Sequence, residues 1–406
     1  MDPIILHDWA ALAIRWLHVV TAIAWIGSSF YFIALDLGLQ KAPGLPENAH
    51  GEEWQVHGGG FYHITKYLVA PARMPEHLTW FKWESYATWL TGLAMLAVLY
   101  WAQSELFLID PAKMELARWE AIAISAGSLV VGWVIYDTLC KSRLGENPTT
   151  LMLLLFVLLV AMAWGYDQVF TGRAELLHLG AFTATIMTAN VAMVIMPNQR
   201  IVVRDLKAGR RPDPKYGKIA KLRSTHNNYL TLPVVFLMLS NHYPLAFASR
   251  YNWLIAALVF LMGVTIRHFF NTKHARKPWP WWTWGVTALL FAAAVWLSTL
   301  GTQRLPDEER LTTAQARLIE DPHFDDVRNI VLGRCSMCHA ETPGWPGITT
   351  APRRIVLETD AQIARTARDI LTQAGLTDAM PPANVSFMEP AERAVIRAWI
   401  DSAGRG

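Results

Sequence analysis

The sequence predicts an all-α protein: an eight-helix transmembrane bundle followed by a small, soluble helical domain. Of the 406 residues, 53% are hydrophobic and 17% are charged, whereas a typical soluble domain has about 25% charged residues. The 19 tryptophans suit aromatic belts at membrane interfaces. Residues 302–406 contain 12 Arg, no Lys and 15 acidic residues, whereas the rest of the chain has an excess of basic residues. The chain therefore divides into two parts of different character.

Eight stretches before residue 302 are apolar enough to form membrane-spanning helices, which need roughly 20 mostly apolar residues each. Five are long enough as they stand, whereas the third, sixth and seventh must extend into polar flanking residues. Eight buried helices of a soluble protein are the alternative, but the low number of charged residues argues against it. The apolar centres are residues 16–35, 85–102, 121–136, 149–166, 176–197, 228–240, 251–266 and 281–301.

The basic residues of the loops predict the orientation, because short cytoplasmic loops are enriched in Lys and Arg. Loops 37–84, 141–148, 198–223 and 271–280 carry 18 Lys and Arg, whereas the opposite loops carry four. The first stretch is not expected to be a cleaved signal peptide, since residues 1–10 contain no Lys or Arg. We therefore predict a multi-pass protein of a bacterial inner membrane with both termini in the periplasm. The basic segment 198–223 is interpreted as a topology signal, so no nucleic-acid partner is expected.

A short motif, Cys335-Ser-Met-Cys338-His339, is the signature of covalent c-type haem attachment. Its two thiols can add to the two vinyl groups of one haem, and His339 can ligate the iron. A zinc site would need a second ligand pair, which the one remaining cysteine, Cys140, cannot supply. A redox dithiol would leave His339 without a role. We predict one covalent haem c in a class I-like cytochrome c domain, which would lie outside the cytoplasm.

Two downstream methionines could supply the second axial ligand. Met380 precedes two prolines, and their stiffened loop can hold a thioether toward iron. Met388 directly precedes an amphipathic final helix and is expected to pack in the core. Met380 is therefore the predicted ligand opposite His339, and such His/Met ligation raises the reduction potential. The predicted domains are a membrane domain (1–301), a linker (302–320) and a cytochrome c domain (321–406).

Ionisable residues at membrane depth are costly and are therefore candidates for function. Arg15 and His18 lie in the outer half of the first stretch, and His178 lies in the outer half of the fifth. Such histidines could ligate an additional membrane haem, although no single stretch carries two widely spaced histidines. The alternative is that they make hydrogen bonds between helices, and the sequence leaves both interpretations open.

A second polar group is predicted toward the cytoplasm, where the sixth and seventh stretches form an antiparallel hairpin. Its amides, fixed positive charge and imidazoles suit a flat, anionic ligand. Alternatively, these side chains lie among lipid headgroups at the helix ends. The residues are His226, Asn227, Asn228, Arg267 and His268.

The first cytoplasmic loop mixes aromatic and charged residues between positions 58 and 84. This pattern predicts an interfacial or re-entrant segment that covers a pocket. An amphipathic surface helix is the alternative.

Several segments together resemble the membrane-bound urate oxidase (urate hydroxylase) family, in which an eight-span domain is fused to a C-terminal cytochrome c. Any cytochrome c has a CxxCH motif, so the membrane segments carry the resemblance, which spans nearly the whole chain. The segments are RWLHVVTAIAWIGSSFYF from Arg15, GGGFYHITKYLVAP from Gly58, LTWFKWESYATWLTG from Leu78, NVAMVIMPNQR from Asn190, STHNNYLTLP from Ser224, and CSMCHA with the later MPPAN.

The resemblance implies that urate is hydroxylated to 5-hydroxyisourate with oxygen from water. Two electrons would pass to haem c and then to an external cytochrome c or a terminal oxidase, without hydrogen peroxide. Because urate is a planar anion, we expect Arg267, Asn227 and Asn228 to bind it. The catalytic base would then be His226 or His268. Arg15 and His18 form an alternative, outer site.

Electron transfer constrains this interpretation. One haem accepts one electron, whereas urate oxidation yields two. A cytoplasmic substrate site would also lie about 30 Å of membrane from an outer haem, which is too far for one direct transfer. Either the haem is reoxidised during the cycle or a second redox centre exists.

Other functions remain open from the sequence. The chain could be a haem c-bearing respiratory electron carrier without substrate chemistry of its own, but such proteins usually have paired haem-ligand histidines on the same helices. It could also oxidise a different purine. A transporter or sensor with a haem-bearing regulatory domain would bind a ligand without reduction of its haem.

Overall fold

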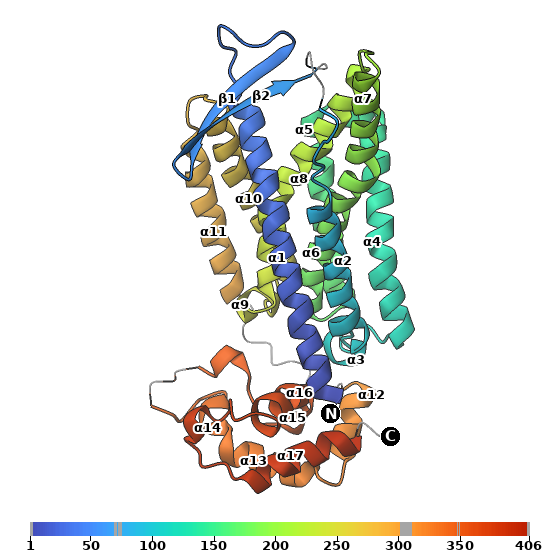
Figure 1. Cartoon of the computed structure of the whole chain (residues 1–406). Coiled ribbons are helices and arrows are strands. Elements are labelled where there is room, and N and C mark those ends of the chain that lie inside the picture. Colours follow the sequence, from blue (N-terminus) through green and yellow to red (C-terminus); the bar gives the residue numbers. More distant parts are fainter. Residues whose placement is uncertain are drawn as a thin grey trace.

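The computed structural model describes residues 3–68, 71, 75–300, 311–346, 348 and 350–403. The chain forms a bundle of long helices followed by a smaller helical domain at the C-terminus, as Figure 1 shows. Residue 301 of the eighth predicted stretch and residues 302–310 of the predicted linker lie outside the described part.

Six helical segments of the bundle are long and apolar enough to cross a membrane. Each overlaps one of the predicted stretches. One of them is a continuous run in which a π-helical turn, η3 (Asn190–Ile195), joins α6 to α7. The segments are α1 (Pro3–Gly38), α4 (Arg118–Lys141), α5 (Pro148–Val169), α6 (Gly172–Ala189) with α7 (Met196–Lys207), α10 (Asn252–His274) and α11 (Trp282–Thr299).

The two remaining predicted stretches are also helical and lie within the same bundle (Figure 1). One is α2 (Trp83–Met95), which continues as the π-helix η1 (Leu96–Trp101), and the other is α8 (Pro214–Ser240). The first ten residues of α8 include Lys215, Lys218, Lys221 and Arg223, so this helix is less apolar than the other six. The helices are confirmed, whereas the membrane crossing of these two stays a prediction. Short helices α3 (Ser104–Phe107), α9 (Pro244–Phe247) and η2 (Arg143–Glu146) lie in the connections.

The apolar core of the bundle centres on α6 and includes buried residues of α4 and α5. Helix α8 packs against both α6 and α10. Close approach of α8 and α10 depends on Gly263, because a Cβ there would lie 2.4 Å from Cδ of Pro233. Pro233 lies inside α8 and lacks the backbone N–H of an ordinary helical residue. This contact lies near the polar side chains of α8 and α10 and sets the distance between the two helices.

The loop after α1 forms a β-hairpin, so the alternative of an amphipathic helix between residues 58 and 84 is wrong. Strands β1 (Ala49–His57) and β2 (Gly60–Tyr67) pair antiparallel. They are joined by Gly58 and Gly59, whose φ angles of 59° and 78° match a tight hairpin turn. Lys66 forms an ion pair with Asp36 of α1, and Arg276, just after α10, pairs with Glu53 at 3.2 Å. The hairpin thereby covers the end of the bundle opposite the C-terminal domain (Figure 1).

The C-terminal domain packs short helices around its own core. Trp399 is fully buried there, and its indole N–H donates to the carbonyl of Leu318 at 2.7 Å. Leu318 belongs to α12, so part of the predicted linker is the first helix of this domain. The elements are α12 (Thr313–Glu320), α13 (Phe324–Arg334), α14 (Ser336–His339), η4 (Pro352–Arg354), α15 (Asp360–Arg365), α16 (Ala367–Ile370), η5 (Leu371–Gly375), η6 (Pro382–Asn384) and α17 (Pro390–Ala403).

The first turns of α1 extend to the C-terminal domain (Figure 1). Arg368 of α16 donates to Nδ1 of His7 and to Oδ1 of Asp8, both at 2.7 Å. The start of α1 and the C-terminal domain therefore lie at the same end of the bundle, which we call the domain end. The opposite end is the hairpin end. This arrangement agrees with the prediction of both termini on one side of a membrane.

Candidate functional site

The Cys335–His339 segment, the predicted site of haem attachment, is a compact turn at the end of α13. Cys335 caps the end of α13, and α14 is a single turn that presents Cys338 and His339 directly after it. His339 Nδ1 donates to the carbonyl of Ile355 at 2.8 Å, which leaves Nε2 for an iron ligand. Within the described ranges no group of three His, Cys, Asp or Glu residues could hold a metal ion by itself. The residues present therefore fit haem c better than a zinc site.

The two candidate methionine ligands have different environments. Met388 is 3% exposed and packs inside the core, where Asn384 bonds both its N–H and its carbonyl. Met380 is half-buried and packs at the margin of the same core, as Cys335 does. This difference supports Met380 as the ligand opposite His339, because a buried core methionine has no free side toward a haem.

The carbonyl of Met380 is held by Arg393, which the sequence analysis did not identify. One guanidinium nitrogen, Nη1, donates to the carbonyls of Ala374, Thr377 and Met380 at 2.6, 3.1 and 3.0 Å. Arg393 is 9% exposed, so these bonds are shielded from water. We therefore regard Arg393 as a positioning residue for Met380.

Replacing Arg393 with lysine should loosen the Met380 loop. The loss of hydrogen bonds from a charged donor should lower the free energy of unfolding of the domain by about 1.5–3 kcal/mol. The sulfur-to-iron charge-transfer band of the oxidised protein should weaken, and its midpoint potential should fall. Arg397→Lys is the matched control, because Arg397 donates to Gly375 and does not touch Met380. An unchanged band and potential in Arg393→Lys would contradict this role.

Arg15 and His18, the predicted outer site, have different surroundings. Arg15 is exposed near the domain end. The pKa of His242, in the loop after α8, is lowered by desolvation and then by the positive charges of Arg15, Arg353 and Arg173. Arg15 therefore belongs to a basic group between the bundle and the C-terminal domain, whereas His18 points into the bundle. The structure does not join the two residues in one site.

At the hairpin end, Arg267 and Asn228 lie together as the hairpin geometry predicts. Arg267 Nε donates to Asn228 Oδ1 at 3.3 Å, and Arg267 Nη2 donates to Asn271 Oδ1 at 3.0 Å. Asn271 Nδ2 also donates to Asn228 Oδ1 at 2.9 Å. The guanidinium lies 4.0 Å from the ring centre of Phe30 on α1. We call Arg267, Asn228 and Asn271 the Arg267 group.

The Arg267 group has unused capacity for an anion. Arg267 is 4% exposed, and no carboxylate pairs with it in the described part of the chain. The side-chain N–H groups of Asn228, which is fully buried, have no hydrogen-bond partner. A buried cation without a counter-charge is costly. An anion bound beside the guanidinium and the amide would relieve this cost.

Asn271 and His274 are residues of this site that the sequence analysis missed. They follow Arg267 by four and seven positions in α10, so all three share one face of the helix. Nδ1 of His274 is buried without a hydrogen-bond partner. Their spacing of four and seven residues from Arg267 places them on its face of the helix, and this spacing could have identified them from the sequence.

His226 and Asn227 face a different group of side chains. His226 Nδ1 bonds the hydroxyl of Tyr136 at 2.7 Å, and its Nε2 is buried without a partner. Asn227 accepts from Asn190 at 2.9 Å and donates to the carbonyl of Met187. Arg223 in this region is compensated by Asp137 at 2.7 Å. Tyr136 and Asn190 therefore join His226 and Asn227 in one hydrogen-bond network. Of these three consecutive residues of α8, only Asn228 bonds Arg267.

His268 does not belong to the Arg267 group, and the expectation that it faces this cluster is wrong. It is exposed, and its ring centre lies 6.1 Å from that of Trp282 at the start of α11. Successive residues of a helix are turned by about 100°, so His268 cannot share the face of Arg267.

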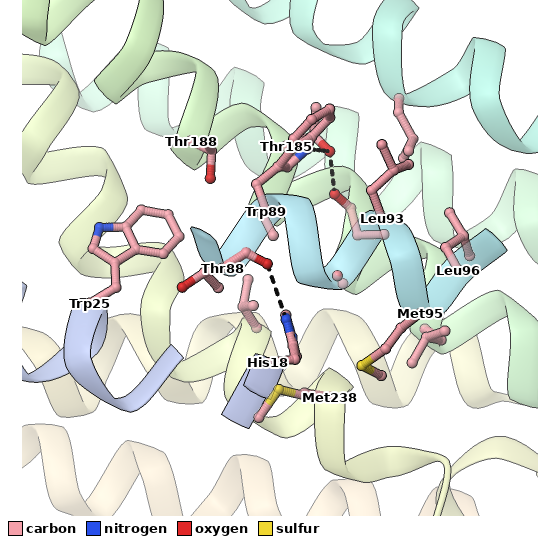
Figure 2. A pocket seen from close by; sticks show the side chains of 17 residues that line it. His18, Trp25, Thr88, Trp89, Leu93, Met95, Leu96, Thr185, Thr188 and Met238 are labelled. Atoms are coloured by element: carbon pink, nitrogen blue, oxygen red, sulfur yellow. Dashed lines mark hydrogen bonds between the residues drawn. The ribbon is translucent and has the colours of Figure 1, made fainter. Parts of the chain in front are cut away.

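A cavity lies between these polar groups and the domain end. It has two small adjoining parts of about 90 and 50 Å³, which are partly open and share six lining residues. Figure 2 shows His18 bonded to Thr88, with Trp25, Met95 and Met238 around the same space. Asn227 lines the part nearer the hairpin end. No Lys, Arg, Asp or Glu lines either part.

Comparisons with known proteins agree with the sequence resemblance for the bundle. The family described as "Urate oxidase N-terminal" matches residues 4–298, which include all of the described helices from α2 to α10. No curated protein and no solved structure matches the chain. Because the match covers well over half of the sequence, the chain belongs to the urate oxidase N-terminal family.

Proposed function

We propose that this protein is a membrane-bound urate oxidase that hydroxylates urate to 5-hydroxyisourate. One urate and one water give one 5-hydroxyisourate, two protons and two electrons. The electrons pass to haem c in the C-terminal domain and then to an external cytochrome c or a terminal oxidase, so no hydrogen peroxide forms. Two observations together support this proposal most directly. Residues 4–298 belong to the urate oxidase N-terminal family, and the same chain carries a CxxCH motif in its C-terminal domain.

In this proposal the protein lies in a bacterial inner membrane with its C-terminal domain in the periplasm. Six helices suitable for crossing a membrane and the 18 basic residues of the hairpin-end loops support this orientation. Bound at Cys335 and Cys338, haem c would supply one-electron redox chemistry at the outer surface.

Urate binds at the Arg267 group. Urate is a planar anion at neutral pH, and the guanidinium of Arg267 is a buried cation without a carboxylate partner in the described residues. A charge-assisted hydrogen bond to such an anion is about twice as strong as a neutral one. The unpartnered amide N–H groups of Asn228 can donate to a urate carbonyl. Phe30 provides an aromatic face beside the guanidinium.

His274 is the catalytic base in this proposal. It lies on the same face of α10 as Arg267, about 10 Å along the helix. Its Nδ1 has no hydrogen-bond partner and can accept the proton of that water. His226 faces α4 through Tyr136, and His268 faces α11, so neither is placed beside the Arg267 group.

Replacing His274 with glutamine should therefore lower kcat by about 10²–10⁴-fold, the usual contribution of a general base. The dependence of kcat on pH near the histidine range should also disappear. His268→Gln is the control, because His268 lies in the same part of α10 but points away from Arg267. The kcat of this variant should be unchanged. Steady-state kinetics with urate measure both variants. A normal kcat in His274→Gln would remove the residue from the reaction.

The proposed function is tested by an anaerobic titration of the oxidised, detergent-purified protein with urate. The haem α-band should appear as urate is added, with two electrons delivered for each urate consumed. In air, urate should be consumed without hydrogen peroxide when an external cytochrome c is present. A haem that dithionite reduces but urate does not would contradict the proposal. That result would instead indicate that the protein is an electron carrier or that it oxidises another purine.

A further inference from the structure

The three side chains of the Arg267 group form a closed triangle of hydrogen bonds. A guanidinium only donates, so each asparagine must turn its amide oxygen toward Arg267. Nη2 donates to Asn271 Oδ1 at 3.0 Å, and Nε donates to Asn228 Oδ1 at 3.3 Å. The amide nitrogen of Asn271 donates to the same Asn228 oxygen at 2.9 Å. Asn271 therefore makes the shorter of the two bonds that orient the Asn228 amide.

The triangle leaves donors available for a ligand. Asn228 Oδ1 already accepts from both Arg267 and Asn271, so the amide nitrogen of Asn228 points out of the triangle. This nitrogen is buried, and its N–H groups have no hydrogen-bond partner. Nη1 of Arg267 also has no hydrogen-bond partner among the described residues. The two nitrogen atoms without partners are therefore both donors, and one of them belongs to a cation.

The triangle is shielded from water on most sides. Arg267 is 4% exposed, Asn228 is fully buried, and the ring of Phe30 lies against the guanidinium. Asn271 is only half-buried, so the triangle is partly exposed on its side. Shielded hydrogen bonds are electrostatically stronger than exposed ones, and a shielded group without a partner is costly. The atom of Asn228 that points out of the triangle therefore determines which ligand is favoured.

We propose that Asn271 is a positioning residue that sets the specificity of this site, because it holds the N–H groups of Asn228 toward the ligand. The inference rests on the proposed function, in which urate binds at the Arg267 group. The site then selects a ligand edge that carries negative charge and adjacent acceptors, such as the deprotonated ring nitrogen and neighbouring carbonyl of urate. A neutral purine edge with an N–H group is disfavoured, since that N–H would face the donors of Asn228 and Arg267.

A purely structural role for Asn271 is the alternative, in which it only holds Arg267 one helical turn earlier in α10. The two roles depend on different atoms of the same amide. The structural role needs only the oxygen, which accepts from Arg267. The positioning role also needs the nitrogen, which donates to Asn228. A substitution that keeps the oxygen and removes the N–H groups therefore distinguishes the two roles.

Asn271→Asp is that substitution. Its carboxylate has nearly the shape of the amide and keeps an acceptor for Arg267, so the variant should remain folded. A carboxylate cannot donate to Asn228 Oδ1, so the Asn228 amide should turn over and present its oxygen to the ligand. The carboxylate also compensates the charge of Arg267. The dissociation constant of urate should therefore rise by about 10- to 150-fold, the usual loss for a hydrogen bond to a charged group. That of neutral xanthine should not rise.

Equilibrium dialysis of the full-length protein in detergent measures both dissociation constants at slightly acid pH, where urate is an anion and xanthine is neutral. The protein is kept reduced with dithionite, so it takes no electrons from urate and binding is measured without turnover. Asn147→Asp is the matched control, because Asn147 caps the start of α5, where Asp is an equally good cap. This control makes the same chemical change away from the Arg267 group and should bind both ligands normally.

The outcomes separate this inference from the proposed function. Unchanged urate binding in Asn271→Asp would overturn the inference and leave Asn271 with the structural role alone. An equal loss of urate and xanthine binding would also overturn it, because a site that is merely damaged does not discriminate by charge. In both cases the proposed urate oxidation could still stand, since it is tested by the reduction of haem c. If the unmodified protein bound no urate, both the urate site and this inference would be wrong.

Discussion

Replacing Cys335 and Cys338 together with serine should reduce urate-dependent reduction of an external cytochrome c to the background of membranes that lack the protein. Without the two thiols, haem cannot be attached covalently beside His339, and the electron path would end in the bundle. The effect should be on electron delivery to the acceptor, since both residues lie in the C-terminal domain, far from the Arg267 group. A coupled assay of cytochrome c reduction in membranes measures it.

The third cysteine gives a matched control for this pair. Cys140 lies at the end of α4 and is a free thiol. Cys140→Ser should retain full activity and one covalent haem. If the double variant transfers electrons from urate at the normal rate, haem c is not on the path, and the respiratory role of the C-terminal domain must be abandoned.

Replacing Arg267 with alanine should raise KM for urate by about 10- to 150-fold, which corresponds to the loss of about 1.5–3 kcal/mol for a hydrogen bond to a charged group. The bundle should tolerate the change, because Arg267 has no carboxylate partner in the described structure that would be left buried alone. Arg267→Lys keeps the charge but loses the planar geometry of the guanidinium, so its KM should rise less. Steady-state kinetics in detergent distinguish these outcomes.

Arg15→Ala separates the two locations considered for urate. Arg15 lies in the basic group at the domain end, so this variant should leave KM unchanged if urate binds at the Arg267 group. A raised KM in Arg15→Ala together with a normal KM in Arg267→Ala would move the substrate site to the outer half of the bundle.

The long helices and the contact between Asn228 and Arg267 could be predicted from the sequence. Both follow from the spacing of residues along the chain and from helix geometry. Apolar stretches of sufficient length located all eight long helices, and an antiparallel hairpin of α8 and α10 placed Asn228 beside Arg267. The CxxCH motif predicts haem attachment at Cys335, Cys338 and His339, which stays a prediction. Each of these inferences needs only helix geometry and the spacing of residues along the chain.

The predictions that were wrong or incomplete depend on which way a side chain points from its helix, or on packing between distant segments of the chain. His268 neighbours Arg267 in the sequence but points toward Trp282, since one residue turns the side chain to another face. The β-hairpin was missed because its aromatic and charged residues also suit an interfacial helix, although Gly58-Gly59 between two extended segments is a hairpin signal. The assignment of α12 depends on the contact of Leu318 with Trp399, 81 residues later, which no local pattern reveals.

Helix α1 fixes the distances between three sets of contacts along the molecule. Its residues contact the C-terminal domain at His7 and Asp8, line the cavity from His18 to Ser29, and contact Arg267 at Phe30. One inserted residue would advance the remainder of the helix by 1.5 Å and rotate it by about 100°. A single insertion between His7 and Phe30 would therefore misalign at least one of these contacts, even if the inserted residue were a good helix former. Single substitutions on its lipid-facing side should be tolerated far better than any change in its length.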